Sequence, residues 1–242
     1  MNIKKNIISL FMSVIIIACC SNSLNAATIN KATANLQISN TTLLQNAKLL
    51  QKDGASTYYL LNDRIIKTVV KLANEETIKS EGNIYNKEAD VNVTLYESKK
   101  LQLSEIKRLT SSKSALNKSD SAMNKSGNIK AKLKVKYTWT TIKNKELLRL
   151  ISATSSYKKI IQGEGVVPQK SKLYWRADGT IYTNNVAGKR GTLGKTTNYS
   201  KPTFSNVTLM PSTKKIDPVT AGVEYTLYCT RGVTIKVNIP FV

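Results

Sequence analysis

The sequence predicts a mainly β protein, in which a C-terminal antiparallel β-sandwich, or alternatively a small barrel, follows a small α+β module. Two observations predict this class. Residues 129–242 contain about seven strand-like segments separated by turn residues, a pattern typical of a sandwich. The segments predicted to be helical all lie before residue 110.

Residues 1–26 have the three parts of a secretory signal peptide. MNIKK is positively charged, IISLFMSVIIIACC is apolar, and SNSLNA ends at Ala26, after which we expect cleavage. The apolar run is shorter than the ~20 residues that a membrane-spanning helix needs. The leader therefore predicts a secreted protein.

The leader has a second interpretation, which is lipid anchoring at the outer face of the membrane. Ile15–Cys19 resembles the lipobox of bacterial lipoproteins, so Cys19 is a candidate lipidation site. Leu24 is also larger than the residue usually found three places before a signal-peptidase cut. Cleavage after Ala26 would leave Cys229 as the sole cysteine, whereas lipidation of Cys19 would retain Cys20 as a conceivable disulfide partner.

Residues 27–109 form the predicted α+β module. TTLLQNAKLLQK (41–52) has a helical apolar face, and residues 58–73 have one too, although their β-branched residues leave a strand as the alternative. DVNVTLYE (90–97) alternates as a strand does. LSEIKRL (103–109) is predicted to be a short helix that begins near Ser104.

Residues 110–128 are predicted to be a linker or a long mobile loop. The stretch is rich in Ser, Lys and Asn and has few apolar residues to bury. The charge balance of the chain also changes here. Both shifts divide the mature chain into two units.

Residues 129–242 form the predicted basic β-sandwich domain. In IKAKLKVKYTW (129–139) every second residue is apolar, which places four lysines together on the other face of a strand. The remaining elements follow in order: a turn at Asn144–Lys145, a returning strand over 146–160, a hairpin at Asp178–Gly179, a short strand over 205–210, and a final hairpin around Arg231–Gly232.

The chain is strongly basic, with 37 Lys and Arg against 15 Asp and Glu and a net charge of +22. Residues 129–242 hold 20 of the basic residues and five of the acidic ones. Such a field attracts polyanions. For an exported protein the expected partner is an anionic envelope polymer or an anionic lipid surface, and nucleic acid is a partner without sequence specificity.

The lysines of the first predicted strand are the main candidate anion-binding residues. They are Lys130, Lys132, Lys134 and Lys136. Two interpretations stay open: the lysines protect a sheet edge or form a solvated face, or they bind an anion.

Other basic residues extend the candidate site. Lys189, Arg190 and Lys195 lie in VAGKRGTLGKT, which is predicted to be a flexible basic loop because its spacing does not fit a phosphate-binding loop. Arg176 shares a strand face with Tyr174, an aromatic contact candidate for sugar rings or lipid head groups.

Several chemistries lack their usual residues. The chain has no histidine, which removes the common general base of hydrolases and the commonest zinc ligand. No spacing suggests a metal or cofactor site. Five carboxylates occur after residue 128, but their spacing selects no catalytic pair.

The expected function is non-catalytic adhesion, through a basic β-sheet face, to an anionic component of the cell envelope. A membrane-active β-toxin is the first alternative, because amphipathic strands and a mobile segment could serve insertion. A hydrolase that uses carboxylates alone is the second.

Overall fold

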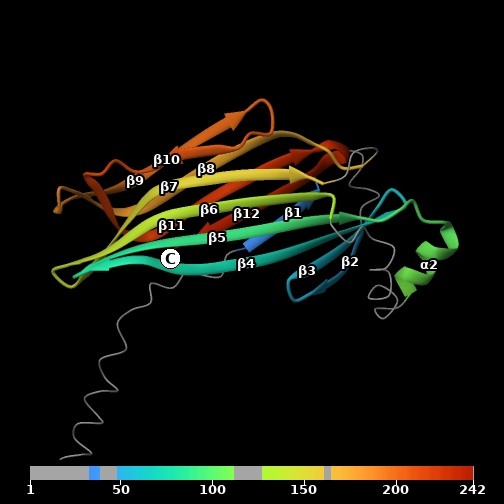
Figure 1. Cartoon of the computed structure of the whole chain (residues 1–242), viewed down its shortest axis with the longest axis horizontal. Coiled ribbons are helices and arrows are strands. Elements are labelled where there is room, and N and C mark those ends of the chain that lie inside the picture. Colours follow the sequence, from blue (N-terminus) through green and yellow to red (C-terminus); the bar gives the residue numbers. More distant parts are fainter. Residues whose placement is uncertain (1–32, 39–47, 112–126, 161–164, 242) are drawn as a thin grey trace, which may run out of the picture.

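The computed structural model describes residues 33–38, 48–111, 127–160 and 165–241. These residues are mainly β: 12 strands belong to one hydrogen-bonded antiparallel sheet, and the α-helix α2 lies near one end of the long strands (Figure 1). The elements are β1 (Thr33–Ile38), β2 (Lys48–Asp53), β3 (Ser56–Leu61), β4 (Arg64–Glu81), β5 (Ile84–Glu97), α2 (Leu103–Ser111), β6 (Ile129–Ile142), β7 (Lys145–Lys159), β8 (Pro168–Thr183), β9 (Val186–Tyr199), β10 (Ser205–Thr208), β11 (Lys214–Cys229), the 3₁₀ turn η3 (Thr230–Gly232) and β12 (Val233–Pro240).

The strands follow the order β1-β12-β11-β7-β6-β5-β4-β3-β2 across the sheet. Two branches leave this path, since β10 pairs with β7, and β8 lies between β11 and β9. β7 and β11 meet at one residue pair, Leu148 with Ile216. Strands from both predicted units belong to this one sheet, because β5 pairs with β6.

Alternation along the long strands turns one side of each strand into the core. On β6 the side chains of Ile129, Ala131, Leu133, Val135 and Tyr137 are fully buried, and the four lysines lie between them on the other side. The apolar side chains of β5 and β6 share one cluster with those of β8, β11 and β12. Each buried aliphatic side chain stabilises the fold by roughly 1.5–3 kcal/mol.

Several predicted elements are confirmed. The strands at 90–97 and 129–139, the returning strand and the short strand at Ser205 are present, as is the final hairpin, in which Arg231 and Gly232 have positive φ values of 58° and 69°. The predicted helix is α2, and the backbone N–H of Gln102 donates to Glu105 Oε2 at 2.8 Å, as in a capping box.

Of the three helices predicted in the first module, the one at 41–52 is wrong where the structure describes it, and residues 58–73 adopt the strand alternative. Lys48–Asp53 is β2, and residues 58–73 belong to β3 and β4, which are joined by a turn at Asn62–Asp63 with φ of 46° and 62°. Pairing with neighbouring strands satisfies the backbone and buries Ile65 and Ile66, so tertiary contacts override the helical spacing.

The predicted hairpin at Asp178–Gly179 is also wrong. β8 runs through both residues, and the chain reverses at Asn184–Asn185, where φ is 48° and 66°. Gly179 serves a different purpose, because a Cβ there would lie 2.0 Å from the backbone oxygen of Asp217 on β11. The glycine permits close approach of two strands and not a turn.

The basic segment VAGKRGTLGKT is a strand and not a flexible loop. It forms most of β9, which pairs with β8 from Val186 to Tyr199. The turn predicted at Asn144–Lys145 lies one residue earlier, at Lys143–Asn144. The register of the hairpins decides that residues 186–196 form a strand and that the turn lies at 143–144. Residue composition does not reveal that register.

The leader, with Cys19, lies outside the described residues, as does most of the predicted linker after Ser111. In the part of the chain that the structure describes, no helix has the length and apolar character needed to cross a bilayer.

Candidate functional site

The lysine ladder of β6, which comprises Lys130, Lys132, Lys134 and Lys136, lies in the interior of the sheet. β6 is paired along its length with β5 on one side and β7 on the other. Edge protection therefore does not account for the ladder. The lysines lie on the side of β6 that faces away from the core, and Lys130 and Lys136 are exposed.

Carboxylates of β5 neutralise part of the ladder. Lys132 Nζ lies 2.6 Å from Asp90 Oδ2, Lys134 contacts Glu88, and Lys136 Nζ lies 3.9 Å from the same carboxylate. The hydrogen bond from Lys134 to Glu88 raises the pKa of that ammonium group. Two carboxylates thus serve three lysines.

Lys130 has different neighbours. It lies opposite Thr94 on β5 and opposite Lys158 on β7, and both lysines are exposed. Among the described residues neither lysine has a carboxylate within ion-pair distance. Like charges placed directly opposite each other destabilise a sheet, so this end of the ladder carries an uncompensated positive charge.

A second polar row lies on β8. Lys170, Lys172, Tyr174, Arg176 and Asp178 alternate with buried residues, so they share the side of β8 that faces away from the core. Tyr174 and Arg176 were predicted from the sequence, and the two lysines were not. Alternation in QKSKLYWRAD, the signal that revealed the ladder of β6, could have found them.

The lysines of the β8 row lie near aromatic rings. Lys170 Nζ is 5.2 Å from the centroid of the Tyr228 ring, and Lys172 Nζ is 6.0 Å from that of Tyr174. Lys172 Nζ also lies 3.9 Å from Glu224 Oε1 on β11. Aromatic rings and ammonium groups are therefore brought together on this row, whereas the sequence had associated Tyr174 with Arg176.

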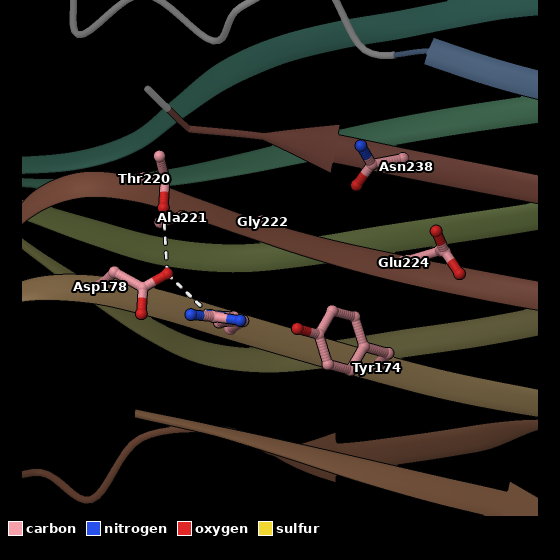
Figure 2. A pocket seen from close by; sticks show the side chains of 8 residues that line it. Tyr174, Asp178, Thr220, Ala221, Gly222, Glu224 and Asn238 are labelled. Carbon is pink, nitrogen blue, oxygen red and sulfur yellow. Dashed lines mark hydrogen bonds and ion pairs between the residues drawn. The ribbon is translucent and has the colours of Figure 1, made fainter. Parts of the chain in front are cut away.

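A pocket of about 230 Å³ lies beside the β8 row (Figure 2). Residues of three strands form it: Tyr174, Arg176 and Asp178 of β8, Thr220, Ala221, Gly222 and Glu224 of β11, and Asn238 of β12. Cross-strand pairing of Tyr174 with Glu224, and of Glu224 with Asn238, places these three side chains in one line across the sheet. Figure 2 shows the carboxylate of Glu224 between the Tyr174 ring and the Asn238 amide.

Asp178 is held by three hydrogen bonds at one end of the pocket. Its carboxylate accepts from Arg176 Nε at 2.7 Å, from Thr192 Oγ1 at 2.5 Å and from Thr220 Oγ1 at 3.1 Å. The bond from Arg176, followed by that from Thr192, lowers the pKa of Asp178 to about 2. Asp178 is therefore an ionised anchor that orients the guanidinium.

The three basic residues of β9 do not form one group with the ladder of β6. All three are exposed, and among the described strands β9 pairs with β8 alone, which makes it an edge strand. Lys195 lies opposite Trp175, so it shares the core side of β8, whereas Arg190 lies opposite Thr180, on the side of the polar row. Lysines and arginines on such an edge also oppose unwanted strand pairing.

Asp217 and Cys229 are not among the residues that line the pocket. Asp217 Oδ2 accepts a hydrogen bond from Lys145 at 2.9 Å, and Glu164 lies outside the described residues. Burial raises the pKa of Cys229 to about 12. Within the described ranges, no three His, Cys, Asp or Glu side chains gather as a metal site would require. Asp178 and Glu224 line one pocket, a pairing that sequence spacing did not select.

Comparison with protein-family models, with curated proteins and with solved structures found no match for this chain.

Proposed function

We propose that the protein is an exported, non-catalytic binding protein that adheres through the outer side of β6 and β7 to an anionic polymer of the cell envelope. One observation carries the proposal. Among the described residues, the ion pairs of the four ladder lysines and Lys158 involve two carboxylates, Glu88 and Asp90, and Glu76 adds a weaker attraction to Lys134. A bound polyanion would supply the missing negative charge.

We also propose that the strands form a β-sandwich. The shared core cluster supports a β-sandwich in which β5 and β6 pack against β11 and β12, with their polar sides directed outward. In that arrangement the described part of residues 27–109 contributes β1, which pairs with β12, and also β2 to β5 and most of α2.

A linear polymer fits the ladder better than a single small anion. Alternate residues of a strand lie roughly 6.6 Å apart, so the four lysines extend over about 20 Å. A chain of phosphate or carboxylate repeats laid along β6 would contact successive ammonium groups. A single phosphate would contact only the end at Lys130 and Lys158.

The state of Asp178 makes this residue unsuitable as the general acid of a glycoside hydrolase. A general acid for glycoside hydrolysis needs a raised pKa, whereas the pKa of Asp178 lies at about 2. Its three hydrogen bonds instead suit a fixed acceptor.

A sedimentation assay tests the proposal with a polyglycerol-phosphate wall polymer as the probe. We expect co-sedimentation with polymer-bearing walls that weakens as salt rises from about 50 to 500 mM. The double substitution Lys130→Thr with Lys158→Thr should reduce binding at least about tenfold at low salt. The matched double substitution Lys48→Thr with Lys52→Thr removes the same charge from exposed positions of β2 and should have a small effect.

Vesicles of anionic lipid and duplex DNA serve as further probes. Equal loss of binding in both double variants would mean that net charge alone attracts the polymer, and would overturn the assignment to the ladder. Dye release from the vesicles would favour the toxin alternative. Stronger retention on DNA than on the wall polymer would replace the proposed partner.

A further inference from the structure

The pocket beside the β8 row is shaped by glycines. Arg176 lies directly opposite Gly194 on β9 and Gly222 on β11, so the two positions that flank it across the sheet carry no side chain. A Cβ built at Gly222 would meet its nearest atom, Asn238 Oδ1, only at 3.5 Å. The hollow therefore exists because position 222 is a glycine, and a larger side chain there would fit into the space.

The pocket presents one aromatic surface. The ring of Tyr174 lines it, and a hydrogen bond with this tyrosine helps to raise the pKa of Arg176, after the larger effect of Asp178. An aromatic ring face carries partial negative charge and attracts the weakly positive C–H bonds of an apolar or sugar ring.

The polar groups around that ring are both donors and acceptors. The Glu224 carboxylate is oriented by Thr226, whose hydroxyl donates to Oε1 at 2.8 Å. Asn238 adds an amide with one donor group and one acceptor, and Arg176, anchored by Asp178, adds N–H donors. Such a mixed set matches hydroxyl groups, which both donate and accept.

Charge argues against an anionic ligand in this pocket. The lining contains one guanidinium and two carboxylates, Asp178 and Glu224. A phosphate or uronate would lie against these carboxylates, in contrast to the surplus of ammonium groups on β6. The volume of about 230 Å³ lies below the range of about 300–1,000 Å³ typical of sites for drug-sized ligands. One ring of a longer molecule is therefore the appropriate occupant.

We propose that this pocket binds one uncharged hexopyranose ring of a polysaccharide, with the ring stacked on Tyr174 and its hydroxyls bonded to Glu224, Asn238 and Arg176. The inference goes beyond adhesion to a polyanion, because it assigns a second site with a different ligand class on a different set of strands. It does not depend on the ladder of β6.

The test uses soluble hexasaccharides of glucose, mannose, galactose and N-acetylglucosamine. Binding is measured by titration calorimetry and by saturation transfer from protein to sugar protons. We expect at least one of the four to bind. Tyr174→Ala should weaken that binding at least about tenfold, and Gly222→Val, which fills the hollow, should do the same. Tyr228→Ala is the matched control, because Tyr228 lies on the same side of the sheet outside the pocket and should change affinity less than about twofold.

Thermal unfolding of each variant shows whether it is folded, and Tyr174→Ala keeps the test decisive if Gly222→Val does not fold. Failure of all four sugars to bind at about 10 mM, a concentration at which even millimolar affinity is detectable, would overturn the inference. Equal binding by wild type and Tyr174→Ala would also overturn it. The double substitution of Lys130 and Lys158 should leave sugar binding unchanged, so this site and the polyanion site can fail separately.

Discussion

Lys130 on β6 lies directly opposite Lys158 on β7, and both ammonium groups are exposed on the outer side of the sheet. A cross-strand pair of like charges is unfavourable in the isolated protein. Threonine, which is a better strand former, would therefore stabilise the fold at these two positions at least as well as lysine does.

Lys130→Thr should consequently stabilise the free protein while it weakens polymer binding. We expect a gain of roughly 0.2–1 kcal/mol in the free energy of unfolding at low salt, and a smaller gain at high salt, where screening already relieves the repulsion. Urea unfolding at two salt concentrations measures both values. A loss of stability in the variant at low salt would contradict the account of this pair.

Glu97 is a buried junction between distant parts of the chain. Its side chain is only 2% exposed, and its carboxylate contacts Arg231 Nη1 at 2.7 Å, Arg64 Nε at 3.6 Å and the backbone N–H of Val166 at 3.0 Å. Glu97→Gln leaves two arginines without their counter-charge. We expect a loss of about 3 kcal/mol in the free energy of unfolding.

Urea unfolding measures the effect of Glu97→Gln, with Glu81→Gln as the matched control. Glu81 contacts Lys79, but its side chain is 63% exposed, so its loss should cost at most about 1 kcal/mol. Similar losses in the two variants would show that Glu97 contributes no more to the free energy of unfolding than an exposed glutamate does.

Stability should decline at alkaline pH because of two buried groups. Burial raises the pKa of Tyr225 from 10.0 to about 12 and that of Cys229 from 9.0 to about 12. Both groups hold their protons more tightly in the folded state, so their contribution is complete below pH 9 and falls as pH rises towards 12. For Tyr225 the loss is on the order of 3 kcal/mol.

Thermal unfolding between pH 8 and 12 should therefore show a falling midpoint, with a shallower fall in Tyr225→Phe.

The native thiol of Cys229 should resist alkylation by iodoacetamide at neutral pH, which mass spectrometry can measure. Rapid alkylation of folded protein would contradict the burial of this cysteine.

Asp178 should respond to pH in the opposite direction. Its pKa is lowered from 3.8 to about 2, so the folded state favours the carboxylate. The stabilising contribution is present above about pH 4 and is lost as pH falls through 2. An NMR titration of the Asp178 carboxyl carbon should give a midpoint near 2, and a midpoint near 3.8 would show that its three hydrogen bonds do not persist in solution.

The parts of the fold that follow from local alternation could be predicted from the sequence. The period of two in residues 129–139 revealed both the buried face of β6 and the row of lysines, because a strand exposes alternate residues whatever its neighbours are. Residues 168–178 alternate in the same way, so the same pattern could have added Lys170 and Lys172 to the predicted site.

Features that depend on pairing partners could not be predicted. Residues 58–73 have apolar residues at helical spacing, yet hydrogen bonds to β2 and β5 make them strands. Asp178–Gly179 is a common hairpin dipeptide, but the backbone of β11 requires the glycine for close approach, and Asp178 anchors Arg176 instead.

By itself the sequence determined that this protein is basic, lacks histidine and is built from amphipathic strands, because charge, residue type and alternation are properties of the chain alone. Tertiary structure alone decided which carboxylates face the lysines of β6 and which residues of β8, β11 and β12 surround one pocket. The physical reason is that strand order and register join residues distant in sequence, and no local preference encodes that pairing.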